Sequence, residues 1–348
     1  MIYVHNPFRA AETGPAGLDG APWPSVDAQT PAQLVARCPV AAQTPLISVP
    51  AIAERCGVGE VWIKDERNRM GLGSFKALGA AYVIAHDASN GDVSGVTYVA
   101  ASAGNHGMSV AAGAAAFGAR AVIYIAETVP GSFADRLRAQ GAEVVRAGTI
   151  YEESMTAAAR AADENGWRLL SDSSWPGYFD RPHRLMEGYL VLMRETVAQM
   201  GEPPTHIFVQ AGVGGLAGAV AAYARKNWGD GPHIVVVEPD AAQALKGSIE
   251  AGRATDIPGP VSAMGRLDCK VPSLIALKGL AHDADTFAAI TEEEGHAGAD
   301  LAARTGLDST PSGVAGLSGL LASGPHRDGF GLTAASRVLL FLSEGPEK

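Results

Sequence analysis

The segment His206-Ile207-Phe208-Val209-Gln210-Ala211-Gly212-Val213-Gly214-Gly215-Leu216 joins an apolar strand, a glycine-rich turn and the start of an alanine-rich helix. The exposed amides of such a turn and the N-terminus of its helix can bind a phosphate group. The turn fits the dinucleotide pattern G-x-G-x-x-G only loosely, although Glu238 follows the next strand as that fold requires. The turn alone leaves three interpretations open: a structural turn, a dinucleotide site or a lone phosphate site.

Strands and helices alternate along most of the chain around this segment. Such an order is typical of parallel β-α units, and strands as uniformly apolar as these are covered on both faces. We therefore predict an α/β fold with two lobes, residues 80–180 forming the smaller lobe and residues 1–79 with 181–348 the larger one. Strands are predicted at 96–100, 121–125, 143–146, 168–171, 206–210, 234–237 and 338–342, and helices at 107–117, 133–140, 151–162, 185–200 and from 215 to about 225.

Composition and charge narrow the class of ligand. The chain has 348 residues, 47% hydrophobic and 18% charged, with a formal net charge of -10. We expect a small-molecule ligand and no nucleic acid, because no cluster of Lys and Arg reverses the negative balance. Three cysteines without CxxC spacing favour neither disulfides nor a zinc site, so no metal is predicted.

The chain shows no secretion signal at its N-terminus, and we expect a cytoplasmic protein. Its least polar long segment, 99–126, is interrupted by Asn105, His106 and Arg120, which argues against a membrane span. The first forty residues are rich in Pro, Gly and Ala, and we expect them to wrap over the surface before the fold proper begins.

Ligands of open parallel sheets bind beyond the carboxyl ends of the strands. Five residues occupy such positions, namely Ser102, Asp172, Gly212, Glu238 and Ser343. They are the first candidates for a functional site.

Ser102-Ala103-Gly104-Asn105-His106-Gly107 is a second turn between a strand and a helix. Its exposed amides and the Ser102 hydroxyl suit a carboxylate, and Asn105 adds a neutral donor for a phenolic oxygen. A histidine one turn into a helix is more often a packing or capping element than a general base. We therefore do not assign catalysis to His106.

Lys76 lies in the run Gly71-Leu72-Gly73-Ser74-Phe75-Lys76-Ala77-Leu78-Gly79, which carries no other charge. Most lysines are solvated surface charges. Here the apolar neighbours favour burial, and a buried lysine has a lowered pKa and can form a Schiff base.

The order of three motifs resembles that of the fold-type II pyridoxal phosphate enzymes. The motifs are Ser-Phe-Lys, Ser-x-Gly-Asn-His and the glycine-rich turn. That group includes the threonine dehydratases and the tryptophan synthase β-chain. The segments 64–79, 104–107, 172–178 and 210–214 resemble more specifically the diaminopropionate ammonia-lyases, with the likeness running from about Cys38 to Gly345. The Asp-x-x-Trp-x-Gly-Tyr element at 172–178 separates the diaminopropionate ammonia-lyases from the broader group, because that group shares the other motifs.

The resemblance implies a two-lobed fold with pyridoxal 5'-phosphate between the lobes, and a homodimer. Lys76 would hold the cofactor as a Schiff base, Asn105 would contact its ring hydroxyl, and Ser343 would face the pyridine nitrogen. A hydroxyl there would not keep that nitrogen protonated, which favours prompt β-elimination over transamination. The phosphate would lie on Gly212, Val213, Gly214, Gly215 and Leu216, and the substrate on Ser102, Ala103, Gly104 and His106.

The reaction that the resemblance implies is β-elimination on a small β-substituted amino acid, giving a 2-oxoacid such as pyruvate and ammonia. The freed amine of Lys76 or a nearby carboxylate would remove the Cα proton. Asp172 is the second candidate catalytic residue, acting on that proton or on the leaving amine, although a turn cap is its structural alternative. Asp65 and Glu66 are more typical of structural residues.

One position departs from the family pattern. Many diaminopropionate ammonia-lyases carry Asp before Gly-Asn-His, and that acid is tied to use of the D-substrate, whereas this chain has Ala103. We therefore expect an L-selective enzyme or another β-substituted substrate. The alternatives are a serine, threonine or hydroxyaspartate dehydratase, a nicotinamide-dependent oxidoreductase and a non-catalytic cofactor carrier.

Overall fold

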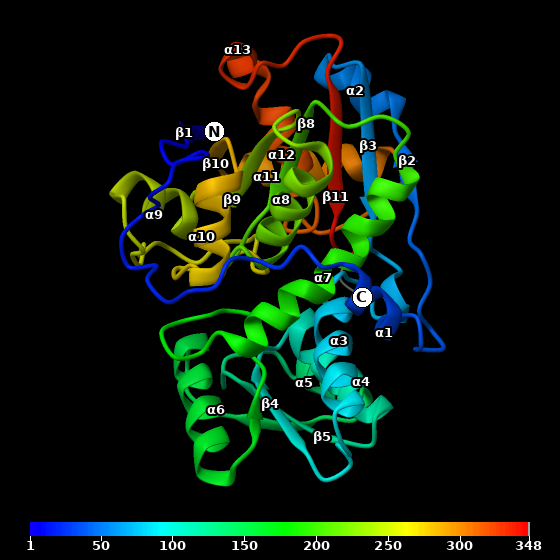
Figure 1. Ribbon diagram of the computed structural model, residues 1–348, viewed down its shortest axis with the longest axis vertical. Helices are drawn as coiled ribbons and strands as arrows, with labels where there is room; N and C mark the ends of the chain where they lie inside the picture. Colours follow the sequence, from blue (N-terminus) through cyan, green and yellow to red (C-terminus); the bar gives the residue numbers. More distant parts are fainter. Residues whose placement is uncertain (347–348) are drawn as a thin grey trace.

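A seven-stranded sheet forms the frame of the larger lobe. The computed structural model describes residues 1–346, and Figure 1 shows this lobe above a smaller one. The strand order is β1-β10-β9-β8-β11-β3-β2, with parallel inner strands and antiparallel edges at β1 and β2. The strands are β1 (Ile2–His5), β2 (Leu46–Ser48), β3 (Glu60–Asp65), β8 (His206–Gln210), β9 (His233–Pro239), β10 (Thr286–Ile290) and β11 (Arg337–Leu342).

A four-stranded parallel sheet forms the frame of the smaller lobe, in the order β6-β5-β4-β7. Its strands are β4 (Thr97–Ala101), β5 (Arg120–Ile125), β6 (Glu143–Arg146) and β7 (Arg168–Leu169). All four fall within residues 80–180, while the larger sheet draws its strands from both sides of that range. The residue limits of the two lobes remain our proposal.

Helices cover both faces of the larger sheet. Helix α8 packs against β8, and α12 packs against β8, β9, β10 and β11. The helices are α1 (Gln29–Val35), α2 (Pro50–Cys56), α3 (Lys76–Ser89), α4 (Asn105–Ala116), α5 (Gly131–Ala139), α6 (Tyr151–Asn165), α7 (Asp180–Gln199), α8 (Gly215–Trp228), α9 (Ala244–Ala251), α10 (Leu274–Asp283), α11 (Glu292–Arg304), α12 (Ala315–Ala322) and α13 (Arg327–Phe330), with short 3-10 turns η1 (Arg69–Gly71) and η2 (Gly324–His326).

Strand β8 shows why the central strands are apolar throughout. All five of its residues are buried. Because side chains alternate along a strand, Ile207 and Val209 join the core cluster on the α8 side, whereas Phe208 joins the cluster that contains Leu317 and Leu320 of α12. Burying each such side chain contributes roughly 1.5–3 kcal/mol, so the strand that carries the glycine-rich turn is held firmly on both faces.

Helix α7 connects the two lobes, and Figure 1 shows it crossing the middle of the molecule. It packs against both α3 and α8. At the crossing with α3 two glycines replace side chains: a Cβ on Gly188 would lie 2.6 Å from the Leu78 carbonyl oxygen, and one on Gly79 would lie 2.7 Å from Tyr189 Cε1. The close approach fixes α3, and with it Lys76 at its first position, against α7.

A buried cluster of charges ties β3 and η1 to α7. The Nζ of Lys64 lies 2.7 Å from Glu195, and the Arg69 guanidinium pairs with both Glu66 and Glu195 at 2.7 Å. Lys64, Glu66 and Arg69 are at most 1% exposed. Asp65 binds the side chain of Arg67. Both acids of the Asp65-Glu66 pair thus make the structural contacts expected of them.

The N-terminal segment differs from its prediction. Residues 2–5 do not simply wrap over the surface, because β1 pairs with β10 and forms an edge of the larger sheet. A short strand with little alternation carries too weak a sequence signal to be predicted. Helices α4 and α7 also begin earlier than predicted, at Asn105 and Asp180. No helix among residues 1–346 is long and apolar enough to cross a membrane.

Candidate active site

Lys76 and Asp172 form an ion pair that joins the start of α3 to the segment after β7. Lys76 is the first residue of α3, and Asp172 follows β7 of the smaller sheet. The Lys76 Nζ lies 2.5 Å from Asp172 Oδ2, and the two side chains are 21% and 18% exposed. Residues 96 positions apart in sequence therefore meet at a site that is partly exposed to solvent.

Each member of this pair shifts the pKa of the other. Burial alone would lower the pKa of Lys76, but the adjacent Asp172 carboxylate holds it above its ordinary value. Burial would likewise raise the pKa of Asp172, whereas the Lys76 ammonium, followed by His106, holds it well below its usual range. The lowered lysine pKa predicted from the apolar sequence is therefore wrong for this form of the protein, because that sequence does not reveal the carboxylate partner.

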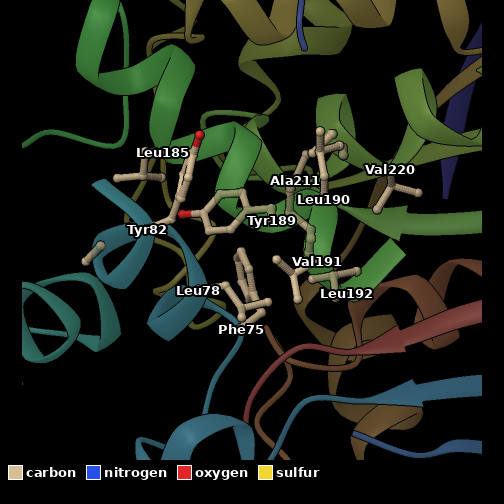
Figure 2. Close-up of a cluster of buried hydrophobic side chains, with 14 of the residues drawn as sticks. Phe75, Leu78, Tyr82, Leu185, Tyr189, Leu190, Val191, Leu192, Ala211 and Val220 are labelled. Atoms are coloured by element: carbon tan, nitrogen blue, oxygen red, sulfur yellow. The ribbon is translucent and has the colours of Figure 1, made fainter. Parts of the chain in front are cut away.

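Aromatic rings enclose the Lys76 ammonium. Its Nζ lies 5.2 Å from the centroid of Phe75 and 5.8 Å from that of Tyr189, which comes from α7. The two rings meet edge to face at 4.9 Å. Figure 2 shows them among apolar side chains of α3 and α7. Such a wall limits access of water to the amine and strengthens the electrostatic contact with Asp172.

The turn before α4 presents amides and an amide side chain to the site. Gly104 begins the helix without a side-chain cap, so the first backbone N–H groups of α4 are available to an anion. The backbone N–H of Gly104 itself donates to Ser102 Oγ at 3.2 Å. The side-chain amide of Asn105 donates to the carboxylate of Glu344, which also accepts from the Thr310 hydroxyl and is 5% exposed.

His106 is a packing residue in this structure. It is 5% exposed, and its Nε2 lies 2.7 Å from the Leu170 carbonyl oxygen. Nε2 must donate in that contact because a carbonyl oxygen only accepts, and Nδ1 has no partner among the described residues. Burial lowers the pKa of His106, which keeps the ring neutral. The substrate contact that the family likeness implied for His106 stays a prediction.

The glycine-rich turn after β8 leads directly into α8. Gly214 is the N-cap residue at a φ of +101°, and the helix has no side-chain cap. That left-handed conformation favours glycine. A Cβ on Gly212 would lie 3.0 Å from Cys269 Sγ and 3.2 Å from Leu267 Cα, because the segment before α10 crosses the turn. The uncapped N-terminus of α8 is the second place in the cleft where an anion can bind.

Backbone contacts bring the end of β11 to the Lys76 segment. The backbone N–H of Phe75 donates to the Ser343 carbonyl at 3.1 Å, and Ser74 forms a bridge with Glu344. Ser343 is 6% exposed, and its hydroxyl lies 3.5 Å from the Gly313 carbonyl oxygen. The structure thus gathers Lys76, Asp172, Asn105 and Ser343 from four separate regions of the chain.

Glu238 does not face the site. It is fully buried, and its carboxylate accepts hydrogen bonds from the backbone N–H groups of Leu245 and Lys246 at 2.8 and 2.7 Å. The carboxylate is therefore committed to the start of α9 and is not free to bind a ribose. This removes the one residue that favoured a dinucleotide at the Gly212 turn.

Tyr189 and Cys269 lie at the site although neither belongs to a motif. Only the path of α7 and of the segment before α10 brings them there, so the sequence alone offers no signal for either residue. Within residues 1–346 no group of three or more His, Cys, Asp or Glu side chains could hold a metal ion.

The arrangement supplies an amine, a carboxylate beside it and two helix N-termini that can hold anionic groups.

Known proteins are similar in sequence to the segments that form this site. Residues 38–344 match the family model described as pyridoxal-phosphate dependent enzyme. The diaminopropionate ammonia-lyase of Salmonella typhimurium is 31% identical over 350 residues, which cover 89% of this chain and 86% of the relative. A serine dehydratase-like protein of Mus musculus is 29% identical over 251 residues, 72% of each chain.

Solved structures agree with the sequence relatives. The diaminopropionate ammonia-lyase of Escherichia coli in complex with an aminoacrylate-PLP azomethine reaction intermediate superposes with a TM-score of 0.87 at 28% identity, covering 99% of this chain and 93% of that one. The same enzyme in complex with D-serine gives a TM-score of 0.88 at 27% identity with the same coverage.

Proposed function

This chain belongs to the family of pyridoxal-phosphate dependent enzymes, and from that premise we propose that it catalyses β-elimination in the manner of a diaminopropionate ammonia-lyase. The products would be pyruvate and ammonia. The observation that carries this proposal is the ion pair between Lys76 and Asp172 at 2.5 Å, which places an amine and a carboxylate together in the cleft.

The residues present fit the cofactor. Lys76 supplies an amine for the cofactor aldehyde, and the uncapped N-terminus of α8 with Gly212, Val213, Gly214, Gly215 and Leu216 suits its phosphate. We propose that the Asn105 amide contacts the ring hydroxyl and that the Ser343 hydroxyl faces the ring nitrogen. When bound, pyridoxal phosphate withdraws electrons from the Cα of an attached amino acid.

Lys76 and Asp172 have separate roles in this proposal. The Lys76 amine, once displaced by the amine of the substrate, removes the Cα proton. Asp172 binds the departing group on the β-carbon. The α-carboxylate lies at the uncapped start of α4, held by the backbone of Ala103 and Gly104 and by the Ser102 hydroxyl.

The charge of Asp172 favours an ammonium over a hydroxyl as the leaving group. Its pKa is well below the usual range, so the group is a carboxylate at neutral pH. A carboxylate attracts a β-ammonium group and can hold it by a charge-assisted hydrogen bond, whereas a neutral hydroxyl gains much less. This supports diaminopropionate over serine or threonine. A dehydratase on the same scaffold is the second candidate, supported by the likeness to the serine dehydratase-like protein.

Ala103 supports selectivity for the L-isomer. It offers no acidic group beside the Asn105 turn, so Lys76 and Asp172 are the two acid-base groups that we assign to the reaction. The E. coli relative was solved with D-serine. Which isomers this chain accepts must therefore be measured on this chain. We further propose a homodimer, supported by family likeness alone, and a cytoplasmic location.

The test is a substrate panel on purified, cofactor-loaded protein, with ammonia and 2-oxoacid measured in the same samples. We expect the highest kcat/KM with L-2,3-diaminopropionate, and two molecules of ammonia for each pyruvate because both nitrogens leave. Faster turnover of serine, threonine or hydroxyaspartate would identify a dehydratase. Similar rates with the D- and L-isomers would contradict the inference from Ala103.

A visible spectrum separates loss of catalysis from loss of cofactor. The loaded protein should show the absorbance band of a Schiff base, and Lys76→Ala should not. A native-like band in that variant would show that another residue binds the cofactor. A band without turnover of any amino acid would identify a non-catalytic carrier.

A further inference from the structure

The hydroxyl of Tyr189 is a buried polar group without a partner. Tyr189 lies in the middle of α7 and is 1% exposed. Its hydroxyl makes no hydrogen bond to any residue of the described chain. The Lys76 ammonium lies beside this hydroxyl and acts to lower its pKa, but the hydrogen bond of that ammonium goes to Asp172. A buried hydroxyl left unpaired costs roughly 1–3 kcal/mol, so such a group calls for an explanation.

Three other tyrosine hydroxyls of this protein are paired. Tyr82 donates to Glu187 at 3.3 Å, Tyr98 to Asp87 at 2.9 Å, and Tyr178 to the Leu169 carbonyl at 2.8 Å. The packing of the core is therefore able to satisfy a tyrosine. Tyr189 differs because its buried hydroxyl has no such partner among the described residues.

The position of the ring shows what that hydroxyl can reach. One ring edge faces α3, where the centroids of the Tyr189 and Phe75 rings are 4.9 Å apart. Figure 2 labels both rings in the buried cluster. The other edge faces α8, because a Cβ on Gly215 would lie 3.6 Å from Tyr189 Cε2. Gly215 is the first residue of α8. The hydroxyl carbon is bonded to both Cε1 and Cε2, so the hydroxyl lies between Gly79 of α3 and Gly215 at the start of α8.

We propose that Tyr189 binds the cofactor by donating a hydrogen bond from its hydroxyl to the phosphate held at the N-terminus of α8. A phosphate offers several oxygen acceptors, so it can accept from a side-chain hydroxyl as well as from the backbone amides of the turn. Burial raises the pKa of the Tyr189 hydroxyl above its ordinary value, so it remains protonated and able to donate. The inference concerns the cofactor alone and does not depend on which substrate the enzyme uses.

The experiment compares two cofactors that differ only in the phosphate. Apo-protein is titrated with pyridoxal phosphate and, separately, with pyridoxal, and the Schiff-base absorbance gives a dissociation constant for each. For Tyr189→Phe we expect the dissociation constant of pyridoxal phosphate to rise about tenfold, because one hydrogen bond to a charged group is lost. The dissociation constant of pyridoxal should stay within about twofold of wild type, since the ring and its packing are kept.

Tyr82→Phe is the matched control, because it removes a buried hydroxyl from the same core cluster without facing the cleft. Both constants should be unchanged in it. Equal weakening of both cofactors in Tyr189→Phe would overturn the proposal and place the hydroxyl at Lys76 instead. An unchanged constant for pyridoxal phosphate would overturn it as well. Pyridoxal binding itself reports whether the variant folds, and none of these outcomes depends on turnover.

Discussion

At the scale of single residues, the pair of Lys76 and Asp172 dominates the site. Each side chain alone would be unfavourable in the apolar cleft, and together they offset that cost. The same contact keeps Asp172 ionised and Lys76 protonated. The protonation of both groups therefore depends on one contact between the start of α3 and the segment after β7.

Asp172→Asn should reduce kcat/KM about 10²- to 10⁴-fold, the range for loss of a group acting in proton transfer. Initial rates with the best substrate of the panel measure this. Asp163→Asn, on the exposed face of α6, is the control and should leave the rate unchanged. A rate within about twofold of wild type would leave Asp172 as a turn cap only.

The same variant should change how the stability of the apo-protein depends on pH. The Asp172 contribution is present above its unfolded pKa of about 3.9 and is lost as pH falls through its lower folded pKa. The Lys76 contribution is present below about 10.4 and is lost as pH rises through its higher folded pKa. Urea unfolding should show Asp172→Asn less stable by about 1–3 kcal/mol at pH 7, with the gap narrowing below pH 4 and above pH 10.

Ala103→Asp tests isomer selectivity. If an acid beside the Asn105 turn serves the opposite face of the substrate, the variant should gain turnover of D-2,3-diaminopropionate, by about tenfold or more in kcat/KM. The rate with the L-isomer is the internal control. A variant that folds, binds the cofactor and gains no D-turnover would argue against the role of Ala103.

At the scale of elements, the crossing of α3 and α7 sets the position of Lys76. The crossing is close because Gly79 and Gly188 carry no side chains, which lets the helix backbones touch. Lys76 begins α3 and Tyr189 follows Gly188, so a small separation of the helices moves two groups of the site at once.

Gly188→Ala should therefore destabilise the protein by about 1–3 kcal/mol, since its Cβ would meet backbone atoms that cannot turn away. Gly131→Ala is the control: it also lies in a helix, but a Cβ there has nothing within 4 Å. The control should be neutral or slightly stabilising, because alanine favours helix. Urea unfolding measures both, and equal stability of the two variants would contradict the argument.

At the scale of the whole molecule, a buried charge cluster holds α7 to the larger lobe. Glu195 of α7 pairs with Lys64 of β3 and with Arg69 of η1. The two carboxylates of Glu66 and Glu195 neutralise the charges of Lys64 and Arg69, which are almost completely buried. Removing one member leaves an unpaired buried charge, which costs far more than a surface ion pair contributes.

Glu195→Gln should lower the free energy of unfolding by about 3 kcal/mol at pH 7. Glu202→Gln is the control, because its carboxylate is 75% exposed and lies 3.5 Å from Arg337. It should change stability by less than about 0.5 kcal/mol. The pKa of Glu195 is lowered, despite its burial, by Arg69 and Lys64. The gap between the two variants should therefore shrink as pH falls below about 4, and a small gap at pH 7 would refute this role.

The sequence by itself determined the α/β class, the central strands and the two glycine-containing turns. It could do so because apolar runs, helix periodicity and turn residues are local properties of the chain. It also pointed to Lys76, Asn105, Asp172 and Ser343, since each stands in a short motif or directly after a strand. Their functional roles beyond the family remain proposals.

Only the tertiary structure decided what those residues meet. Four features depend on contacts between distant segments. They are the carboxylate that raises the Lys76 pKa, the hydrogen bonds of Glu238 to α9, the edge strand β1 and the unpaired hydroxyl of Tyr189. Burial, charge pairing and hydrogen-bond satisfaction are properties of the packed chain, because they depend on which surfaces close together. The motifs show which groups the chain carries, and packing alone sets their protonation and their partners.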